Sequence, residues 1–324
     1  MSALRTRMVC LALTTVILLL GSKNSFAAEP IELPIWKGVA PGSELVDERE
    51  LVVDRGKGKG YVDRSISHVH RPTITVHLPQ NSGCKPSPAI IICPGGGLTR
   101  VVIDKEGNDF AKWLSKRGVV GIVLKFRTVK SEKHYYGVSA PTADLKRAIR
   151  FTRSNASKWK IDPTRVGVFG FSAGGHIAAT VLTHFDAGRS SSKDPIERQS
   201  SRPDFAGFAY PLISLQTEVA GKKYQELLLG PSPSAARINE YSNELHVNAN
   251  TPPSFLCHAE NDTSVKVENT HRFAAACKKA GVVCTTFIRP KGGHGYGIRD
   301  QGDPINKWPL EFMGWLERNG FVEK

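Results

Sequence analysis

The chain has 324 residues, 40% of them hydrophobic and 23% charged, which is enough for one large α/β domain with a sizeable core. Its formal net charge is +14 at pH 7. The basic residues are scattered and form no basic helix interleaved with aromatics, which argues against nucleic-acid binding and leaves at most a weak attraction to anionic surfaces.

Residues 1–27 have the layout of a secretory signal peptide. A short basic stretch is followed by an apolar run over residues 8–20 and then by polar and small residues, with Ser25 and Ala27 at the small-residue positions. The apolar run is shorter than the roughly 20 residues that a membrane-spanning helix needs. We therefore expect cleavage after Ala27 and an exported protein, periplasmic or secreted, without stable insertion in the membrane.

Residues 28–60 contain several prolines and glycines, and we expect them to form an arm on the surface before the sheet and the catalytic domain of residues 61–324 begin. From Ile66 onward, short β-rich runs alternate with longer amphipathic stretches, which predicts an α/β fold with a mostly parallel sheet flanked by helices. The predicted strands are 73–77, 89–93, 119–125, 166–169, 205–210, 254–258 and 282–288. The predicted helices are 108–117, 142–159, 173–184, 267–280 and 307–318.

A single long insertion, residues 214–251, separates two of the predicted strands. It contains three leucines at 227–229 and the turn-rich sequence G-P-S-P at 230–233. Two interpretations stay open: a small cap that covers the functional site, or a surface excursion without contact to substrate.

The sequence G-F-S-A-G at residues 170–174 matches the G-x-S-x-G motif. It follows the apolar run 166–169 and precedes a helix-like stretch, so it occupies the strand-to-helix turn of a nucleophile elbow. Glycines on both sides relieve crowding where a non-glycine residue is held in a strained conformation. We therefore predict Ser172 as a nucleophile and the backbone N–H of Ala173 as an oxyanion donor.

Three consecutive glycines follow the predicted strand 89–93. Their backbone N–H groups can converge on a developing oxyanion, and we expect Gly96 or Gly97 to complement Ala173. The Walker lysine and hydroxyl are missing and the spacing differs from G-x-G-x-x-G, so a nucleotide site is not favoured.

A serine nucleophile needs an imidazole as base and an acid that orients this imidazole. Downstream of a nucleophile elbow, the acid and then the histidine are expected in that order. Asp262 lies in the turn after the predicted strand 254–258, with Glu260 as the rival acid. His294 lies in a glycine-rich loop after the strand 282–288, a setting that argues against a core histidine.

Four residues adjoin these catalytic turns and are candidates to line the substrate pocket, although packing roles are equally open: Leu98, Phe171, His176 and Tyr296. The other histidines are assigned structural roles, because the early ones lack a set of carboxylates or cysteines at a spacing suited to a metal. We expect no metal site and no cofactor. Disulfide pairing stays open among five cysteines: Cys84, Cys93, Cys257, Cys277 and Cys284.

Together the motifs resemble the bacterial acetyl-esterase and acetylxylan-esterase-like group of the α/β hydrolases, over about residues 30–324. The resemblance rests on these segments: Trp36 with 38–42, C-P-G-G-G at 93–97, Glu106-Gly107, 141–153 with Asp144 and Arg147, 170–176, 258–269 and 292–297. It implies an α/β-hydrolase fold and catalytic roles for Ser172, Asp262 and His294, in agreement with the assignment from the residues.

The residues thus predict a serine esterase that works through an acyl-enzyme, and the resemblance implies acetyl groups on carbohydrates such as acetylated xylan as its substrates. Two other functions stay open. A small peptidase of the prolyl-oligopeptidase type has the same elbow, although this chain leaves no room for a propeller domain. A catalytically silent binding protein of the same fold is disfavoured by the intact serine, aspartate and histidine set.

Overall fold

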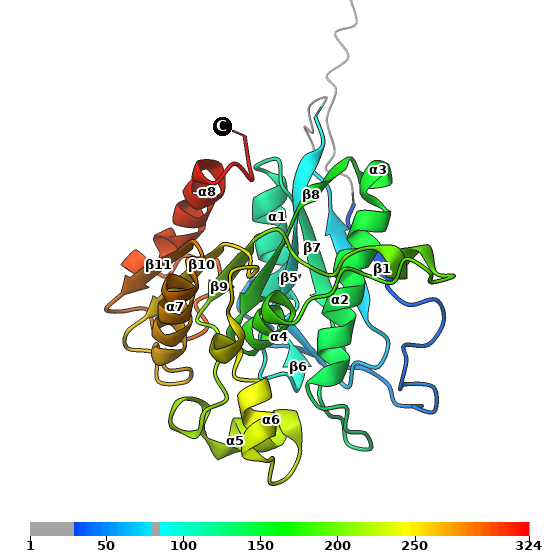
Figure 1. The fold of residues 1–324 in the computed structure, drawn as a ribbon, viewed down its shortest axis with the longest axis horizontal. Coiled ribbons are helices and arrows are strands. Elements are labelled where there is room, and N and C mark those ends of the chain that lie inside the picture. The colour runs from blue at the N-terminus through cyan, green and yellow to red at the C-terminus, as the bar shows by residue number, and fades with distance from the viewer. Residues whose placement is uncertain (1–28, 80–84, 324) are drawn as a thin grey trace, which may run out of the picture.

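The core of the molecule is an eight-stranded sheet, shown in Figure 1 in a computed structural model that describes residues 29–79 and 85–323. The strand order is β1-β4-β7-β5-β8-β9-β10-β11. β1 and β4 are antiparallel at one edge, and neighbouring strands from β7 to β11 are parallel. The strands are β1 (Ile31–Pro34), β4 (Thr73–His77), β5 (Ser87–Cys93), β7 (Val120–Lys125), β8 (Ile161–Phe171), β9 (Ala206–Ala209), β10 (Ser254–Ala259) and β11 (Cys284–Arg289).

Helices cover both faces of this sheet, so its central strands are apolar throughout rather than alternating. β5 is buried at every position, and its Ile91 pairs with Ile122 of β7 and Val168 of β8. In Figure 1 α2 and α4 lie in front of the sheet, whereas α1 packs against α8 through Phe110 and Trp308. The helices around the sheet are α1 (Asp109–Ser115), α2 (Ser139–Ser154), α3 (Ala156–Trp159), α4 (Ser172–Thr183), α7 (Glu268–Ala280) and α8 (Trp308–Arg318), with the short turns η1 (Asp104–Asn108), η2 (Pro195–Arg198) and η4 (Pro304–Lys307) between them.

The predicted α/β fold is confirmed, and every predicted strand and helix is present. The strand 73–77 has the predicted ends, and the other elements differ from the prediction at one or both ends. The predicted helix 142–159 is divided into α2 and α3, because Asn155 leaves the helical region with φ −103° and ψ 9°. Strand β8 is longer than predicted, since it already begins at the buried Ile161.

Two parts of the segment 28–60, predicted as a surface arm, are strands: Ile31–Pro34 and Leu51–Asp54, both mostly exposed. The expectation that the sheet starts only after this segment is therefore wrong. Ile31 of β1 pairs with Val76 of β4, which makes β1 the edge strand of the main sheet. β2 (Leu51–Asp54) forms a small antiparallel sheet with β3 (Arg64–Ser67) and β6 (Arg100–Val101). The loop of residues 94–99, which contains the three consecutive glycines and is called the glycine loop here, lies between β5 and β6. The second sheet therefore anchors the far end of this loop.

The insertion 214–251 folds into α5 (Thr217–Leu229), α6 (Ala235–Glu240) and η3 (Asn243–His246). α5 and α6 lie together at the lower end of the view in Figure 1. The two ends of α5 bond to different loops of the main domain: Val138 N–H donates to the Leu228 carbonyl at 2.9 Å, and Lys266 Nζ donates to the Glu218 carbonyl at 2.8 Å. Within residues 29–79 and 85–323, no helix combines the length and the apolarity that a bilayer crossing requires.

Candidate active site

Ser172 lies at the junction of β8 and α4, where the strand ends at Phe171 and the helix begins one residue later. Its φ is +49°, the left-handed region that a non-glycine residue adopts only under local constraint. A Cβ at Gly174 would lie 2.3 Å from the Cys93 carbonyl oxygen, so only glycine permits the glycine loop to approach this turn so closely. The elbow predicted from the sequence is therefore present.

The structure brings Ser172, His294 and Asp262 together in one chain of hydrogen bonds. Ser172 Oγ lies 2.8 Å from His294 Nε2, and His294 Nδ1 lies 2.7 Å from Asp262 Oδ2. The rival acid Glu260 is exposed. Among the described residues, the carboxylate that bonds to His294 is that of Asp262 and not that of Glu260. The donor and acceptor order is that of a serine nucleophile, its base and the acid that orients the base.

The Asp262 carboxylate is held ionised although its side chain is buried. Burial raises the pKa of this group, but hydrogen bonds from His258 and His294 and from the Val265 amide outweigh that effect, so the pKa lies below its usual range. The Ser264 amide also donates to Asp262 Oδ1, at 2.8 Å. A fixed anion at this place stabilises the imidazolium that forms when the base accepts a proton.

The proposed oxyanion donors lie on two segments that meet at Ser172. Ala173 is the second residue of α4, and N–H groups in the first turn of a helix have no acceptor within the helix. The glycine loop has φ +123° at Gly96 and +65° at Gly97, values that an L side chain rarely adopts. The Gly95 amide is already used by Glu106, which leaves the next two amides of the loop as the candidates.

Sequence reasoning missed three residues that support this site: His258, Tyr210 and Glu106. His258 was assigned a structural role at a strand end, yet its Nε2 lies 3.2 Å from Asp262 Oδ2 and 2.9 Å from the Val265 carbonyl. Tyr210 lies just after β9 with φ +41°, and its ring packs against that of His294. Only the family resemblance singles out Glu106, because its neighbours in the sequence are polar and do not mark it as buried.

The four candidates for pocket lining are all buried side chains. Phe171 packs against Phe110 in the aromatic core, and Tyr296 packs against Tyr210 with its hydroxyl 3.6 Å from Cys257 Sγ, so these two belong to the core rather than to a pocket. His176 lies fully buried in α4 near Asn243, and burial lowers its pKa to about 4. Leu98 is also fully buried, at φ +58° in the glycine loop.

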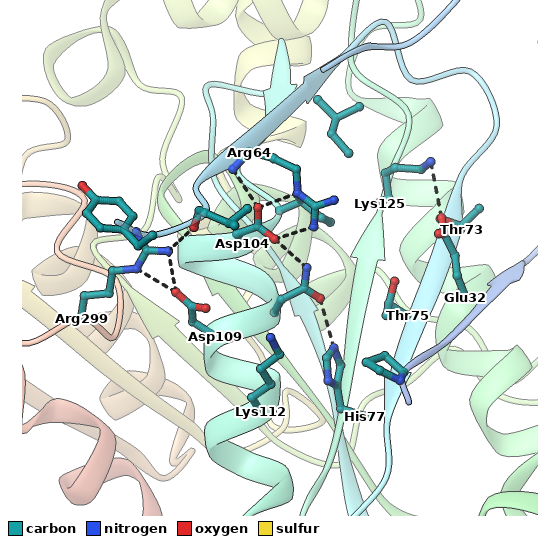
Figure 2. A pocket seen from close by; sticks show the side chains of 16 residues that line it. Glu32, Arg64, Thr73, Thr75, His77, Asp104, Asp109, Lys112, Lys125 and Arg299 are labelled. Carbon is teal, nitrogen blue, oxygen red and sulfur yellow. Dashed lines mark hydrogen bonds and ion pairs between the residues drawn. The ribbon is translucent and has the colours of Figure 1, made fainter. Parts of the chain in front are cut away.

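Cys93, Cys257, Cys277 and Cys284 are free thiols, and burial raises the pKa of Cys93 and Cys257 well above the usual range. Cys84 lies outside the described residues. A cavity of about 800 Å³ lies between β4 and α1 and is lined by charged groups such as Arg64, Asp104 and Arg299 (Figure 2). The triad does not line this cavity, so we assign it no part in the chemistry.

A fully connected Ser-His-Asp chain at the elbow of a mostly parallel sheet defines a serine hydrolase of the α/β-hydrolase class. The model of the BD-FAE family matches residues 74–277. The chain belongs to this family of esterases, which are carboxylic ester hydrolases.

The chain is similar to named proteins that include an acetylxylan esterase and a xylanase. The chain is 32% identical over 225 residues to an acetylxylan esterase of Xylanibacter ruminicola, covering 68% of this chain and 43% of that protein. It is 32% identical over 212 residues to endo-1,4-beta-xylanase B of Butyrivibrio fibrisolvens, covering 64% of this chain and 32% of that protein. The chain therefore spans less than half the length of these two relatives.

Among solved structures, an acetyl ester-xyloside bifunctional hydrolase from Caldicellulosiruptor lactoaceticus is similar over nearly its whole length. The identity is 34%, the TM-score is 0.74, and the alignment covers 91% of this chain and 98% of that one. The butyrate-bound esterase Est2 of Thermogutta terrifontis is 25% identical with a TM-score of 0.65, covering 78% of this chain and 91% of that one.

Proposed function

We propose that this esterase removes acetyl groups from carbohydrate hydroxyls, in acetylated xylan or related oligosaccharides, through an acyl-enzyme. The observation that carries the chemistry is the continuous hydrogen-bond chain from Ser172 through His294 to Asp262. The substrate class is supported by the similarity to an acetylxylan esterase and to an acetyl ester-xyloside hydrolase.

In the first half of the reaction, Ser172 Oγ attacks the ester carbonyl carbon while its proton passes to His294 Nε2. The oxyanion is held by the amides of Ala173 and of Gly96 or Gly97. When the tetrahedral intermediate collapses, the bond to the sugar oxygen breaks and that oxygen takes the proton from His294. An acetyl group then remains on Ser172.

In the second half, His294 removes a proton from a water molecule that attacks the acetyl carbonyl carbon. The second tetrahedral intermediate releases acetic acid, which ionises to acetate in water, and His294 returns its proton to Ser172 Oγ. Asp262 stays ionised throughout and stabilises the imidazolium in both halves. Every proton is exchanged between groups of the site, substrate and water, so the sequence of steps balances without a cofactor.

The test is acetate release from acetylated xylo-oligosaccharides and hydrolysis of p-nitrophenyl acetate and longer p-nitrophenyl esters, by wild type and Ser172→Ala. The exposed Ser157→Ala on α3 is the matched control. Release from both kinds of substrate, lost only in Ser172→Ala, supports the proposal. Hydrolysis of the aryl esters alone rejects the carbohydrate substrate, and serine-dependent cleavage of a short peptide anilide without ester hydrolysis favours the peptidase.

We further propose that the enzyme is exported, on the leader-like pattern of residues 1–27, which lie outside the described residues. The mass of the protein recovered from the periplasm and the medium tests this. A mature chain that starts at Ala28 supports export, and a cytoplasmic chain that still starts at Met1 contradicts it.

A further inference from the structure

We propose that Glu106 and Tyr210 are positioning residues that hold two loops at a fixed separation. These are the glycine loop of residues 94–99, called the oxyanion loop from here on, and the histidine loop of residues 292–297. Glu106 Oε2 accepts a hydrogen bond from the Gly95 amide at 2.8 Å, at the start of the oxyanion loop. Tyr210 Oη–H donates to Glu106 Oε1 at 2.8 Å, and the Gly297 amide, in the histidine loop, donates to Tyr210 Oη at 3.0 Å. These three bonds join the two loops without passing through the triad.

Glu106 is a buried carboxylate in an unusual place. Glu106 is 5% exposed, and among the described residues its hydrogen-bond partners are the Gly95 amide and the Tyr210 hydroxyl rather than a cationic side chain. Burying a carboxylate is costly unless hydrogen bonds replace its hydration, and here the Gly95 amide and the tyrosine hydroxyl supply them. Gly95 is packed between this carboxylate and the nucleophile: a Cβ at Gly95 would lie 2.6 Å from Glu106 Oε2 and 2.9 Å from Ser172 Cβ. We infer that the geometry of the oxyanion loop depends on Glu106.

The turn that carries Glu106 is clamped from its outer side, so Glu106 can act as a fixed support. η1 is a π-helical turn, a rare element that is frequent at functional sites. Arg64 Nε and Nη2 donate to Asp104 at 2.8 Å, and dashed lines join this pair in Figure 2. Asn108 Nδ2 also donates to Asp104. Arg299 follows the histidine loop, and its Nε donates a hydrogen bond of 2.8 Å to Asp109 Oδ2 in α1. Both residues are labelled in Figure 2.

Tyr210 meets the catalytic base directly. Its ring lies edge-on to the His294 ring with centroids 4.8 Å apart, and its φ of +41° is a strained conformation for a tyrosine. Burial, and next the neighbouring Glu106 carboxylate, raise the pKa of Tyr210 well above its usual value, so its hydroxyl remains a proton donor at neutral pH. A shift of this ring therefore moves the base, and a shift of its hydroxyl moves the oxyanion loop.

The experiment compares kcat and KM of Glu106→Gln, Tyr210→Phe and the double variant on p-nitrophenyl acetate, with thermal unfolding measured for each. Tyr296→Phe is the matched control, because it removes a phenol hydroxyl from a similarly buried ring in the same cluster. Among the described residues, the hydrogen-bond partner of that hydroxyl is the Cys257 thiol. We expect each single variant to lose about 10-fold in kcat, a part of the ~10²-fold to 10³-fold lost with a whole oxyanion donor, while KM changes less than twofold.

Because both residues act through one link, the double variant should be no more than about 3-fold slower than the slower single variant. A kcat like that of Tyr296→Phe, losses that multiply in the double variant, or a loss confined to KM would each overturn the proposal. If Glu106→Gln does not fold, Tyr210→Phe carries the test. The proposal rests on the serine esterase chemistry but not on a sugar substrate, so a failure on xylan leaves this aryl-ester test intact.

Discussion

Replacing the buried His176 by leucine should remove much of the acid sensitivity of the fold. His176 lies in α4 with no exposed surface, and among the described residues its Nε2 has no hydrogen-bond partner. Burial lowers its pKa from 6.5 to about 4, so the folded protein excludes a proton that the unfolded chain accepts. The free energy of unfolding therefore falls as pH drops from about 6.5 to 4 and is constant, for this group, above that window.

The difference between a pKa of 6.5 and one of about 4 corresponds to about 3 kcal/mol of stability lost by pH 4. Urea unfolding at pH 7.5 and at pH 4 measures this loss in wild type and in His176→Leu, and the variant should lose about 3 kcal/mol less. Thr180→Val replaces another buried polar side chain on α4 that does not titrate, and it should change the free energy of unfolding by the same amount at both pH values. Equal losses in wild type and His176→Leu would refute the reasoning.

Three further variants test the site by steady-state hydrolysis of p-nitrophenyl acetate. Asp262→Asn removes the acceptor that fixes the His294 tautomer, and kcat should fall about 10⁴-fold while the protein stays folded; a fall below tenfold would contradict this role. Gly174→Ala places a methyl group 2.3 Å from the Cys93 carbonyl oxygen and displaces the oxyanion loop, so we expect about 10²-fold lower kcat, and unchanged kcat would argue against that loop as donor. His258→Gln weakens the second hydrogen bond to Asp262, and a kcat about 3-fold to 10-fold lower at unchanged KM is expected, whereas wild-type kcat would make His258 purely structural.

The parallel core of the fold was predictable because burial on both faces produces apolar runs that stand out in the sequence. The short strands were not. β1 has mostly exposed residues, and its pairing with β4 depends on partners about 40 positions away along the chain. β6 has only two residues, and its partner β3 is set by the path of the glycine loop rather than by a pattern of its own.

The catalytic residues were predictable to the extent that the backbone requires a local signature. Glycines mark both the elbow at Ser172 and the loop before it, but the bond between Glu106 and Tyr210 joins positions 104 residues apart and has no local pattern. For Phe171 the sequence left a pocket role and a packing role equally open. Although it is next to the nucleophile in sequence, successive strand residues point to opposite faces, and its ring enters the core beside α1.

The strand order brings the catalytic segments and the insertion 214–251 to the same edge of the sheet. The segments that carry the oxyanion loop, Ser172, Tyr210, Asp262 and His294 follow the neighbouring parallel strands β5, β8, β9, β10 and β11, so they meet at one edge of the sheet. The insertion 214–251 follows β9, the middle one of these five strands, and must leave the sheet at this same edge. Because α5 bonds to the loop after β7 at one end and to the loop after β10 at the other, it bridges the two sides of the catalytic strands. The insertion 214–251 is thereby tied at both ends to loops at this edge of the sheet, whereas the hydrogen bonds that join Ser172, His294 and Asp262 involve none of its residues.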